Sequence, residues 1–239
     1  MHSTHIPTVK AGSLAARMPG FEARPQQVEM ANAIADAMAK GKKLMVEAGT
    51  TVKRGTPLMV LEAMKGWKAG YALDPATKVG ALVDTGHLHT VLSYIEAGHA
   101  DKAKLLCGGK RTLEETGGVY VEPTIFDDAH NDMRIAKEEI FGPVLTVIPS
   151  DSTEEAIAIA NDSIYGLAAA IWTSNLSKAH LAAKALRVGS MWVNQYDGGD
   201  MTAPFGGFKQ SGNGRDKSLH AFDKYTELKT TWIRIDSPV

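Results

Sequence analysis

The stretch VLTVIPSDSTEEAIAIANDSIYGLAAAIWT, at residues 144–173, decides the fold class of this chain. It begins with the apolar run VLTVI and ends with the apolar run AAAIWT, and TEEAIAIAN between them carries apolar residues at helical spacing. Ser152 and Glu155 form a capping box, which predicts that the helix begins at residue 153. A strand, a helix and a second strand in this order predict two parallel strands joined by a crossover helix.

The same alternation continues on both sides of this stretch. Asp84 or Thr85 can cap a helix that closes at Gly98, and Gly189 can end a later helix. The predicted helices span residues 85–98, 153–161 and 175–189, and the predicted strands span residues 104–107, 144–148, 168–173 and 191–194. This pattern predicts an α/β fold with a mainly parallel sheet.

Composition places the chain among soluble globular proteins. Of its 239 residues, 44% are hydrophobic and 22% are charged, which is the ordinary balance for such a protein. No apolar run approaches the ~18 residues that span a membrane, and MHSTHIPTVK lacks the layout of a signal peptide. The single cysteine excludes an internal disulfide and fits a reducing compartment. We therefore expect a cytoplasmic protein.

Charge is distributed unevenly along the chain. Residues 1–68 carry a net charge of +5 and the remaining residues carry −6, so the whole chain carries −1. A basic segment suits nucleic acid or another anionic partner. The basic residues lack the interleaved aromatic side chains of a single-strand binder, so we expect a solvated face and no nucleic acid.

Residues 1–65 predict a short composite segment. Residues 1–20 are mainly small and polar, and residues 26–41 place apolar side chains at helical spacing and end on Gly41. Apolar runs at residues 44–48 and 56–61 predict two strands with only a short turn between them.

Part of this segment, PGFEARPQQVEMANAIADAMAKGKKLMVEAGT, resembles the N-terminus of DinG-type bacterial helicases. A nucleotide-binding loop of the form G-x4-G-K-[ST] needs its lysine to reach the terminal phosphates and its hydroxyl to hold magnesium. Here the spacing from Gly49 to Gly55 is one residue too long, and Thr56 stands where the lysine is required. The resemblance therefore implies a broken ATP site.

The overlapping stretch VEAGTTVKRGTPLMVLEAMK resembles the biotinyl hairpin of biotin-dependent carboxylases, with Lys65 at the biotin position. That domain needs flanking strands, and Gly66 stands where the family usually has methionine. We expect Lys65 to be a surface lysine that carries no biotin.

Six motifs follow one another between Gly66 and Ile235: GWKAGYALDPATKVGALVD, YVEPTIFDD, AKEEIFGPVLTVI, NDSIYGLAAAIWT, MWVNQYDGGDMTAPFGGFKQSGNGRDKS and YTELKTTWI. In this order and spacing they resemble the C-terminal portion of an aldehyde dehydrogenase of the γ-glutamyl-γ-aminobutyraldehyde type. The resemblance implies an aldehyde-dehydrogenase-like catalytic-domain half at residues 66–239, preceded by the composite segment at residues 1–65. Helicase-like, carrier-like and dehydrogenase-like sequences meet between Val46 and Trp67, which suggests a fused, engineered or generated chain.

The resemblance implies three site residues. Glu139 matches the family residue that binds the nicotinamide ribose hydroxyls, and Phe141 matches the residue that packs near the nicotinamide. Phe205 matches an aromatic residue that lines the substrate pocket. In the alternative interpretation, Glu139 is a solvated or paired carboxylate and both phenylalanines belong to the core.

The resemblance assigns no catalytic residue to this chain. In this family a cysteine thiolate attacks the aldehyde, a glutamate activates water and an asparagine holds the oxyanion. These residues and the cofactor-binding domain lie upstream of the matching part. Cys107 has no histidine nearby in the sequence, so we expect a small apolar core residue. His87 and His89 lie two positions apart on a helix and face different sides, so we expect no metal site.

We therefore expect a truncated aldehyde-dehydrogenase-like chain without turnover, with no tightly held cofactor and at most residual NAD(P) contacts. The alternative is a non-catalytic protein that sequesters or neutralises a partner. YTELKTTWIRI matches part of the family's oligomerisation sheet, so we expect a homo-oligomer or a protein partner bound through an exposed sheet face and this strand.

Overall fold

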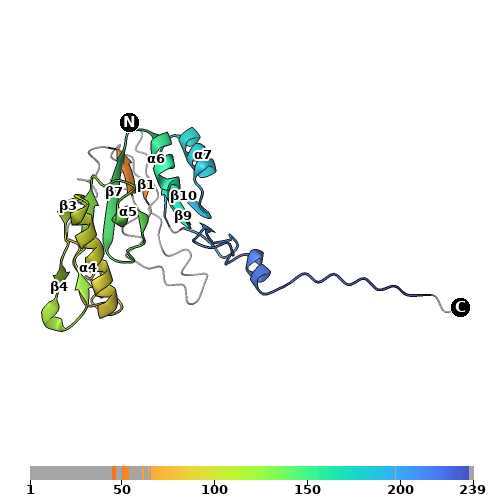
Figure 1. The fold of residues 1–239 in the computed structure, drawn as a ribbon, viewed down its shortest axis with the longest axis horizontal. Coiled ribbons are helices and arrows are strands. Elements are labelled where there is room, and N and C mark those ends of the chain that lie inside the picture. The colour runs from red at the N-terminus through yellow and green to blue at the C-terminus, as the bar shows by residue number, and fades with distance from the viewer. Residues whose placement is uncertain are drawn as a thin grey trace, which may run out of the picture.

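The structure, a computed structural model, describes residues 45–46, 50–53, 61, 64, 66–196 and 198–236. It consists of a body of helices and sheets and an extended segment that leads away from the body toward the C-terminus (Figure 1). The predicted α/β fold is confirmed. The predicted helix at residues 26–41, nearly all of the predicted strand at residues 56–61 and Lys65 lie outside the described residues.

A four-stranded sheet forms the middle of the body. Its order is β2 (Thr50–Lys53), β7 (Val144–Ser150), β6 (Thr124–Asp127) and β3 (Lys104–Cys107). β7 pairs in parallel with β2 and β6, and β3 pairs with β6 in antiparallel. The sequence predicts a turn where β2 lies. TTVK has no apolar alternation, but its β-branched residues favour an extended backbone and β7 offers it a partner.

A second sheet has the order β1 (Met45–Val46), β9 (Ala168–Ile171) and β10 (Ser190–Val193), with β9 and β10 parallel. Two small antiparallel pairs join β4 (Arg111–Thr112) to β5 (Tyr120–Val121) and β8 (Tyr165–Gly166) to β11 (Phe208–Lys209). The described sheets are therefore mixed where the sequence predicted mainly parallel pairing. Helical crossovers generate the parallel pairs, but antiparallel partners at the sheet edges leave no such pattern in the sequence.

The helix starts at Asp84 and Ser152 agree with the predicted caps, and Asn175, predicted as the first residue of its helix, is a further cap. The α-helices are α4 (Thr85–Ala100), α5 (Arg134–Lys137), α6 (Thr153–Asn161) and α7 (Leu176–Ala185), with 3-10 turns at Glu114–Thr116 and Leu219–Lys224. Side-chain oxygens of Asp84, Ser152 and Asn175 each accept a backbone N–H three residues later, at 2.7, 3.0 and 3.0 Å. No helix in the described part of the chain is long and apolar enough to span a membrane.

Two glycines expected to end helices serve another purpose. α4 continues past Gly98, where a Cβ would lie 2.8 Å from Cζ of the buried Phe126 ring. α7 ends before Gly189, where a Cβ would lie 1.7 Å from the backbone oxygen of Gly206. In both places the glycine allows another segment to approach closely, which the sequence pattern does not distinguish from a helix end.

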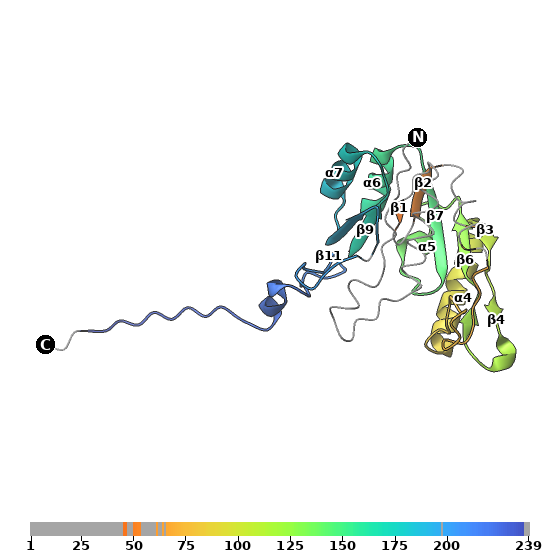
Figure 2. The same cartoon turned by 180° about the vertical axis from the view of Figure 1, so that it is seen from behind.

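Two cores hold the body together. α4 buries Leu88, Val91 and Ile95 against the sheet, where Phe126 is fully buried. A second cluster joins α6 and α7 to β9. Figure 2 shows α4 on one side of β7 and the α6–α7 pair on the other. The segment between α5 and β7 is hydrogen-bonded to α4 through Tyr94 and His87.

Candidate functional site

The turn at residues 138–142 links α5 to β7 and carries two of the three predicted site residues. Glu138 follows the end of α5 in an extended conformation. Ile140 packs into the core with 8% of its surface exposed, whereas Glu139 and Phe141 on either side of it are exposed. The buried isoleucine thus anchors the turn while its two neighbours face outward.

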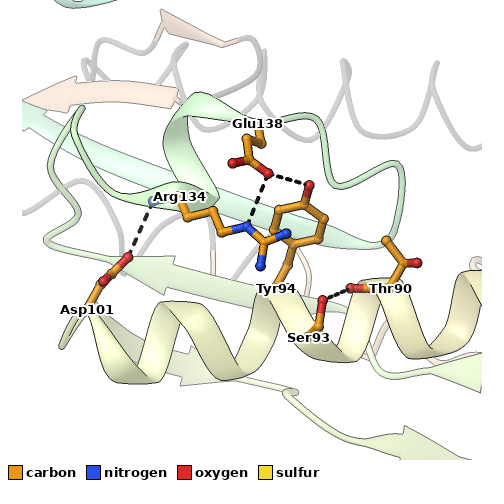
Figure 3. A network of polar contacts seen from close by, with 6 residues as sticks. All are labelled: Thr90, Ser93, Tyr94, Asp101, Arg134 and Glu138. Atoms are coloured by element: carbon orange, nitrogen blue, oxygen red, sulfur yellow. Dashed lines mark hydrogen bonds and ion pairs between the residues drawn. The ribbon is translucent and has the colours of Figure 1, made fainter.

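The adjacent carboxylates of Glu138 and Glu139 differ in their hydrogen bonding within the described residues. Oε2 of Glu138 accepts a hydrogen bond from the Tyr94 hydroxyl at 2.8 Å and another from Nε of Arg134 at 3.1 Å (Figure 3). Glu139 forms no hydrogen bond or ion pair with any residue that the structure describes. The Glu138 carboxylate therefore holds the turn, whereas the Glu139 carboxylate is exposed and has no partner in the part of the chain that the structure describes.

The hydrogen bonds of Glu138 also shift the pKa values of the groups that form them. The hydrogen bond from Tyr94 and, next, the one from Arg134 lower the pKa of the Glu138 carboxyl below its usual range. The same contact with Glu138 raises the pKa of the Tyr94 hydroxyl. The guanidinium carbon of Arg134 also lies 4.3 Å from the centre of the Tyr94 ring. At neutral pH the carboxylate is ionised and the phenol protonated, so donor and acceptor match.

Phe141 is 78% exposed, so its ring is not among the buried core residues that the structure describes. Its backbone is in the left-handed region, with φ 56°. The Nε2 atom of His87 lies 2.7 Å from the Phe141 carbonyl oxygen, and the two rings meet edge-on with centres 6.1 Å apart. A non-glycine residue in this conformation costs on the order of 1–3 kcal/mol, and such residues concentrate at ligand sites.

Phe205 lies on a separate segment, between β10 and β11. Its backbone N–H donates to the carbonyl of Asp216 at 2.9 Å, and its half-buried ring has Nζ of Lys217 at 5.6 Å from its centre. Within the described residues, no hydrogen bond or ring contact joins Phe205 to Glu139 or Phe141. Two of the predicted site residues thus share one turn, and the third lies on a different segment of the chain.

Cys107 has the properties of a structural thiol. It ends β3, is half-buried, and packs against the core strand residue Ile125. Its Sγ donates weakly to the carbonyl of Pro123 at 3.6 Å, and burial raises the pKa of the thiol. A nucleophilic cysteine needs a lowered pKa, so these surroundings oppose such a role. Among the described residues, no group of three or more His, Cys, Asp or Glu is arranged to hold a metal ion.

The sequence predicts Val91 on the apolar face of α4, but it does not indicate that His87 and Tyr94 contact the turn at residues 138–142. His87, Val91 and Tyr94 follow the i, i+4, i+7 spacing of one helix face. This spacing predicts that the three side chains lie on one face of the helix and pack together against another element. Nothing in the sequence indicates that the partner is a turn far along the chain.

An exposed carboxylate beside an exposed aromatic ring suits a particular ligand chemistry. A carboxylate can accept hydrogen bonds from two neighbouring hydroxyls, as it does with ribose in dinucleotide sites. An aromatic face packs against a flat ring. The pair formed by Glu139 and Phe141 therefore fits a ligand that carries a sugar diol next to an aromatic ring.

Comparison with known proteins gives consistent matches. The model of the aldehyde dehydrogenase family matches residues 28–231. PuuC of Escherichia coli (strain K12), an NADP/NAD-dependent aldehyde dehydrogenase, is 49% identical over 179 residues, which are 75% of this chain and 35% of PuuC.

Solved structures agree with this match. AldA of P. syringae, an indole-3-acetaldehyde dehydrogenase variant solved with NAD+ and IAA, is 64% identical with a TM-score of 0.76. The match covers 88% of this chain and 43% of AldA. γ-Glutamyl-γ-aminobutyraldehyde dehydrogenase from Burkholderia cenocepacia J2315 is 49% identical with a TM-score of 0.75, over 86% of this chain and 42% of that one. The chain thus spans less than half the length of each of these relatives.

Proposed function

The chain belongs to the aldehyde dehydrogenase family, and from this premise we propose that residues 138–142 contact the nicotinamide ribose of NAD(P) in an aldehyde-oxidising site. The observation that carries the proposal is the exposed carboxylate of Glu139, which has no hydrogen-bond or ion-pair partner among the described residues, two positions before the exposed Phe141. Glu139 accepts hydrogen bonds from the ribose hydroxyls, and Phe141 packs beside the nicotinamide. When bound, a cofactor of this kind accepts a hydride from the substrate.

For the substrate we propose γ-glutamylaminobutyraldehyde or a similar aldehyde. Support comes from the motifs of this subgroup and from the B. cenocepacia relative of that name. The AldA relative acts on indole-3-acetaldehyde, which supports an aromatic aldehyde as the second candidate. The half-buried Phe205 ring would line the substrate side of the site and pack against the carbon skeleton of either aldehyde.

We further propose that the 239-residue chain does not complete the reaction by itself. Cys107 is its one cysteine, and burial raises the pKa of that thiol instead of activating it. Removing the nucleophile and its partners from a serine protease lowers turnover by about 10⁶, and a loss of that order leaves no measurable rate.

A cofactor-reduction assay tests this proposal. The purified chain is mixed with NAD+ or NADP+ and with γ-glutamylaminobutyraldehyde or indole-3-acetaldehyde, and reduced cofactor is followed by absorbance. We expect no signal from the wild-type chain or from Cys107→Ala. A wild-type rate that disappears in Cys107→Ala would contradict the proposal and identify Cys107 as the nucleophile.

The C-terminal segment favours a second proposal, self-association. Leu228, Trp232, Ile233 and Ile235 are 105, 92, 77 and 85% exposed in an extended segment that leaves the body (Figure 1). In an extended chain, Leu228 and Trp232 fall on one face and the two isoleucines on the other, as in a strand covered on both sides. We propose that this segment pairs with a second copy of the chain, most simply in a two-fold dimer.

Light scattering across a dilution series tests the second proposal. We expect a dimer or larger oligomer that dissociates on dilution and becomes monomeric in Trp232→Ser. Arg234→Ser is the matched control, because Arg234 is exposed on the same segment but ends in a charged guanidinium and not in an apolar ring. A compact monomer at high concentration, or equal effects of the two substitutions, would refute it.

A further inference from the structure

We propose that one face of α4, formed by His87, Val91 and Tyr94, positions the turn at residues 138–142 for cofactor binding. The inference rests on the proposed role of Glu139 and adds three residues that do not touch the cofactor in our proposal. They are positioning residues because each acts on the turn that carries Glu139.

Three contacts connect this face to the turn. His87 Nε2 lies 2.7 Å from the carbonyl oxygen of Phe141, and the Tyr94 hydroxyl donates to Glu138 at 2.8 Å. Between them, Val91 packs so closely on Gly142 that a Cβ at Gly142 would lie 2.7 Å from Cγ2 of Val91. The contacts follow the i, i+4, i+7 spacing of a helix face, so a single rigid element makes all three.

Two of these contacts lie on either side of Glu139. Tyr94 fixes the carboxylate of the preceding residue, and His87 fixes the carbonyl of Phe141, two residues after Glu139. Figure 3 shows Tyr94 of α4 beside Arg134 and Glu138 of the neighbouring segment. At the other end of α5, the backbone N–H of Arg134 donates to Asp101 at 3.3 Å, just beyond the end of α4. The segment at residues 134–142, which includes Glu139, is therefore hydrogen-bonded at both ends to α4 or its C-cap.

These contacts differ from ordinary core packing. The buried residue of the turn is Ile140, and a purely structural interface would be satisfied by contacts with its side chain. The hydrogen bonds instead reach an exposed carboxylate and the carbonyl of an exposed residue in the left-handed region. Such contacts determine where the backbone places Glu139 more than they determine the burial of apolar surface.

Two pairs of substitutions separate positioning from stability. Tyr94→Phe removes only the hydroxyl that Glu138 accepts, and Ser93→Ala removes a neighbouring hydroxyl that bonds within α4, to Thr90. His87→Leu removes the donor to Phe141, whereas His87→Gln retains a side-chain N–H of similar reach.

The readouts are NMR measurements on the isotopically labelled 239-residue chain. Exchange of the Glu138 amide, which donates to Arg134 at 3.1 Å, reports the Tyr94 contact, and backbone carbon shifts of Phe141 report its left-handed conformation. Titration with NAD+ in the millimolar range gives the affinity of the turn for the cofactor.

In Tyr94→Phe we expect roughly tenfold faster exchange of the Glu138 amide, because one hydrogen bond that holds the turn is lost. We also expect NAD+ to bind several-fold more weakly, while Ser93→Ala leaves both measurements at wild-type values. His87→Leu should move the Phe141 carbon shifts and weaken NAD+ binding, and His87→Gln should restore both.

The possible failures are distinguishable. Unchanged NAD+ affinity in Tyr94→Phe and His87→Leu, with a wild-type chain that binds NAD+, would overturn the positioning role and leave the proposed function standing. Unchanged exchange and carbon shifts in these variants would likewise overturn the positioning role. A wild-type chain that binds no NAD+ at these concentrations would overturn the proposed function, and the positioning role with it.

Discussion

Replacing Gly142 with alanine should destabilise the chain by forcing the turn away from α4. The new Cβ would lie 2.7 and 3.0 Å from the two methyl carbons of Val91, closer than carbon atoms approach without displacement. Val91 is fully buried and, being β-branched on a helix, has essentially one allowed rotamer, so it cannot turn aside. The backbone at Gly142 is not in the left-handed region, so alanine meets no conformational strain of its own.

The magnitude follows from two opposing effects. Overpacking a well-filled core costs about 1–3 kcal/mol. Losing a glycine from the unfolded chain returns about 0.4–1 kcal/mol. We therefore expect Gly142→Ala to lower the free energy of unfolding by about 1–2 kcal/mol. Gly80→Ala is the matched control, because a Cβ there meets nothing within 4 Å and its backbone is also outside the left-handed region.

Urea unfolding followed by tryptophan fluorescence measures these differences, and a double-mutant cycle identifies their cause. Val91→Ala alone removes about 1.6 kcal/mol of buried apolar transfer energy, plus a cavity contribution. In the double variant the added methyl group has room, so the combined loss should fall short of the sum by about 1–2 kcal/mol. A Gly142→Ala chain as stable as Gly80→Ala, or losses that add within about 0.5 kcal/mol, would refute the contact.

Three further predictions concern other contacts. Because its hydrogen bond lowers the pKa of Glu138, Tyr94 contributes stability that is present above the ordinary glutamate pKa of about 4.3 and is lost as pH falls through the lowered pKa. The gap in urea midpoint between wild type and Tyr94→Phe should therefore be wide at neutral pH and narrow in acid. Ser152→Ala removes the N-cap of α6 and should lower the free energy of unfolding by about 1 kcal/mol, measured in the same way. Cys107, whose thiol pKa is raised by burial, should be alkylated more slowly by iodoacetamide than a free cysteine peptide at neutral pH.

Local signals in the sequence predicted a large part of the fold. Side-chain caps at Asp84 and Ser152 and the apolar runs of the strands act over a few residues, so their meaning does not depend on distant partners. The α6 bounds of Thr153–Asn161 and the β3 bounds of Lys104–Cys107 agree with prediction. Errors arose where a distant segment decided the outcome, as at Gly98 and Gly189, whose close neighbours lie elsewhere in the chain.

In the candidate site, too, local sequence predicted which residues matter, but not the contacts they make with distant segments. Family motifs predicted Glu139 and Phe141 as site residues, because both stand in a contiguous and specific stretch. The motif could not show that Glu138 is paired while Glu139 has no partner among the described residues, since the pairing depends on Tyr94 from α4. It also gave no sign that Phe141 is exposed in a left-handed conformation, because the residue that contacts its carbonyl, His87, lies far away in the sequence.

NAD+ binding to Glu139→Gln tests the central claim most directly. The substitution keeps the size of the side chain but replaces the carboxylate, whose oxygens accept hydrogen bonds from the ribose hydroxyls in our proposal, with a neutral amide. The Glu139 carboxylate makes no contact among the described residues whose loss would disturb the fold. Hydrogen bonds to a charged group are worth about 1.5–3 kcal/mol, so NAD+ affinity measured by NMR titration should fall at least about tenfold. The urea midpoint should stay at the wild-type value. Equal NAD+ affinity in the wild-type chain and in Glu139→Gln would contradict the account.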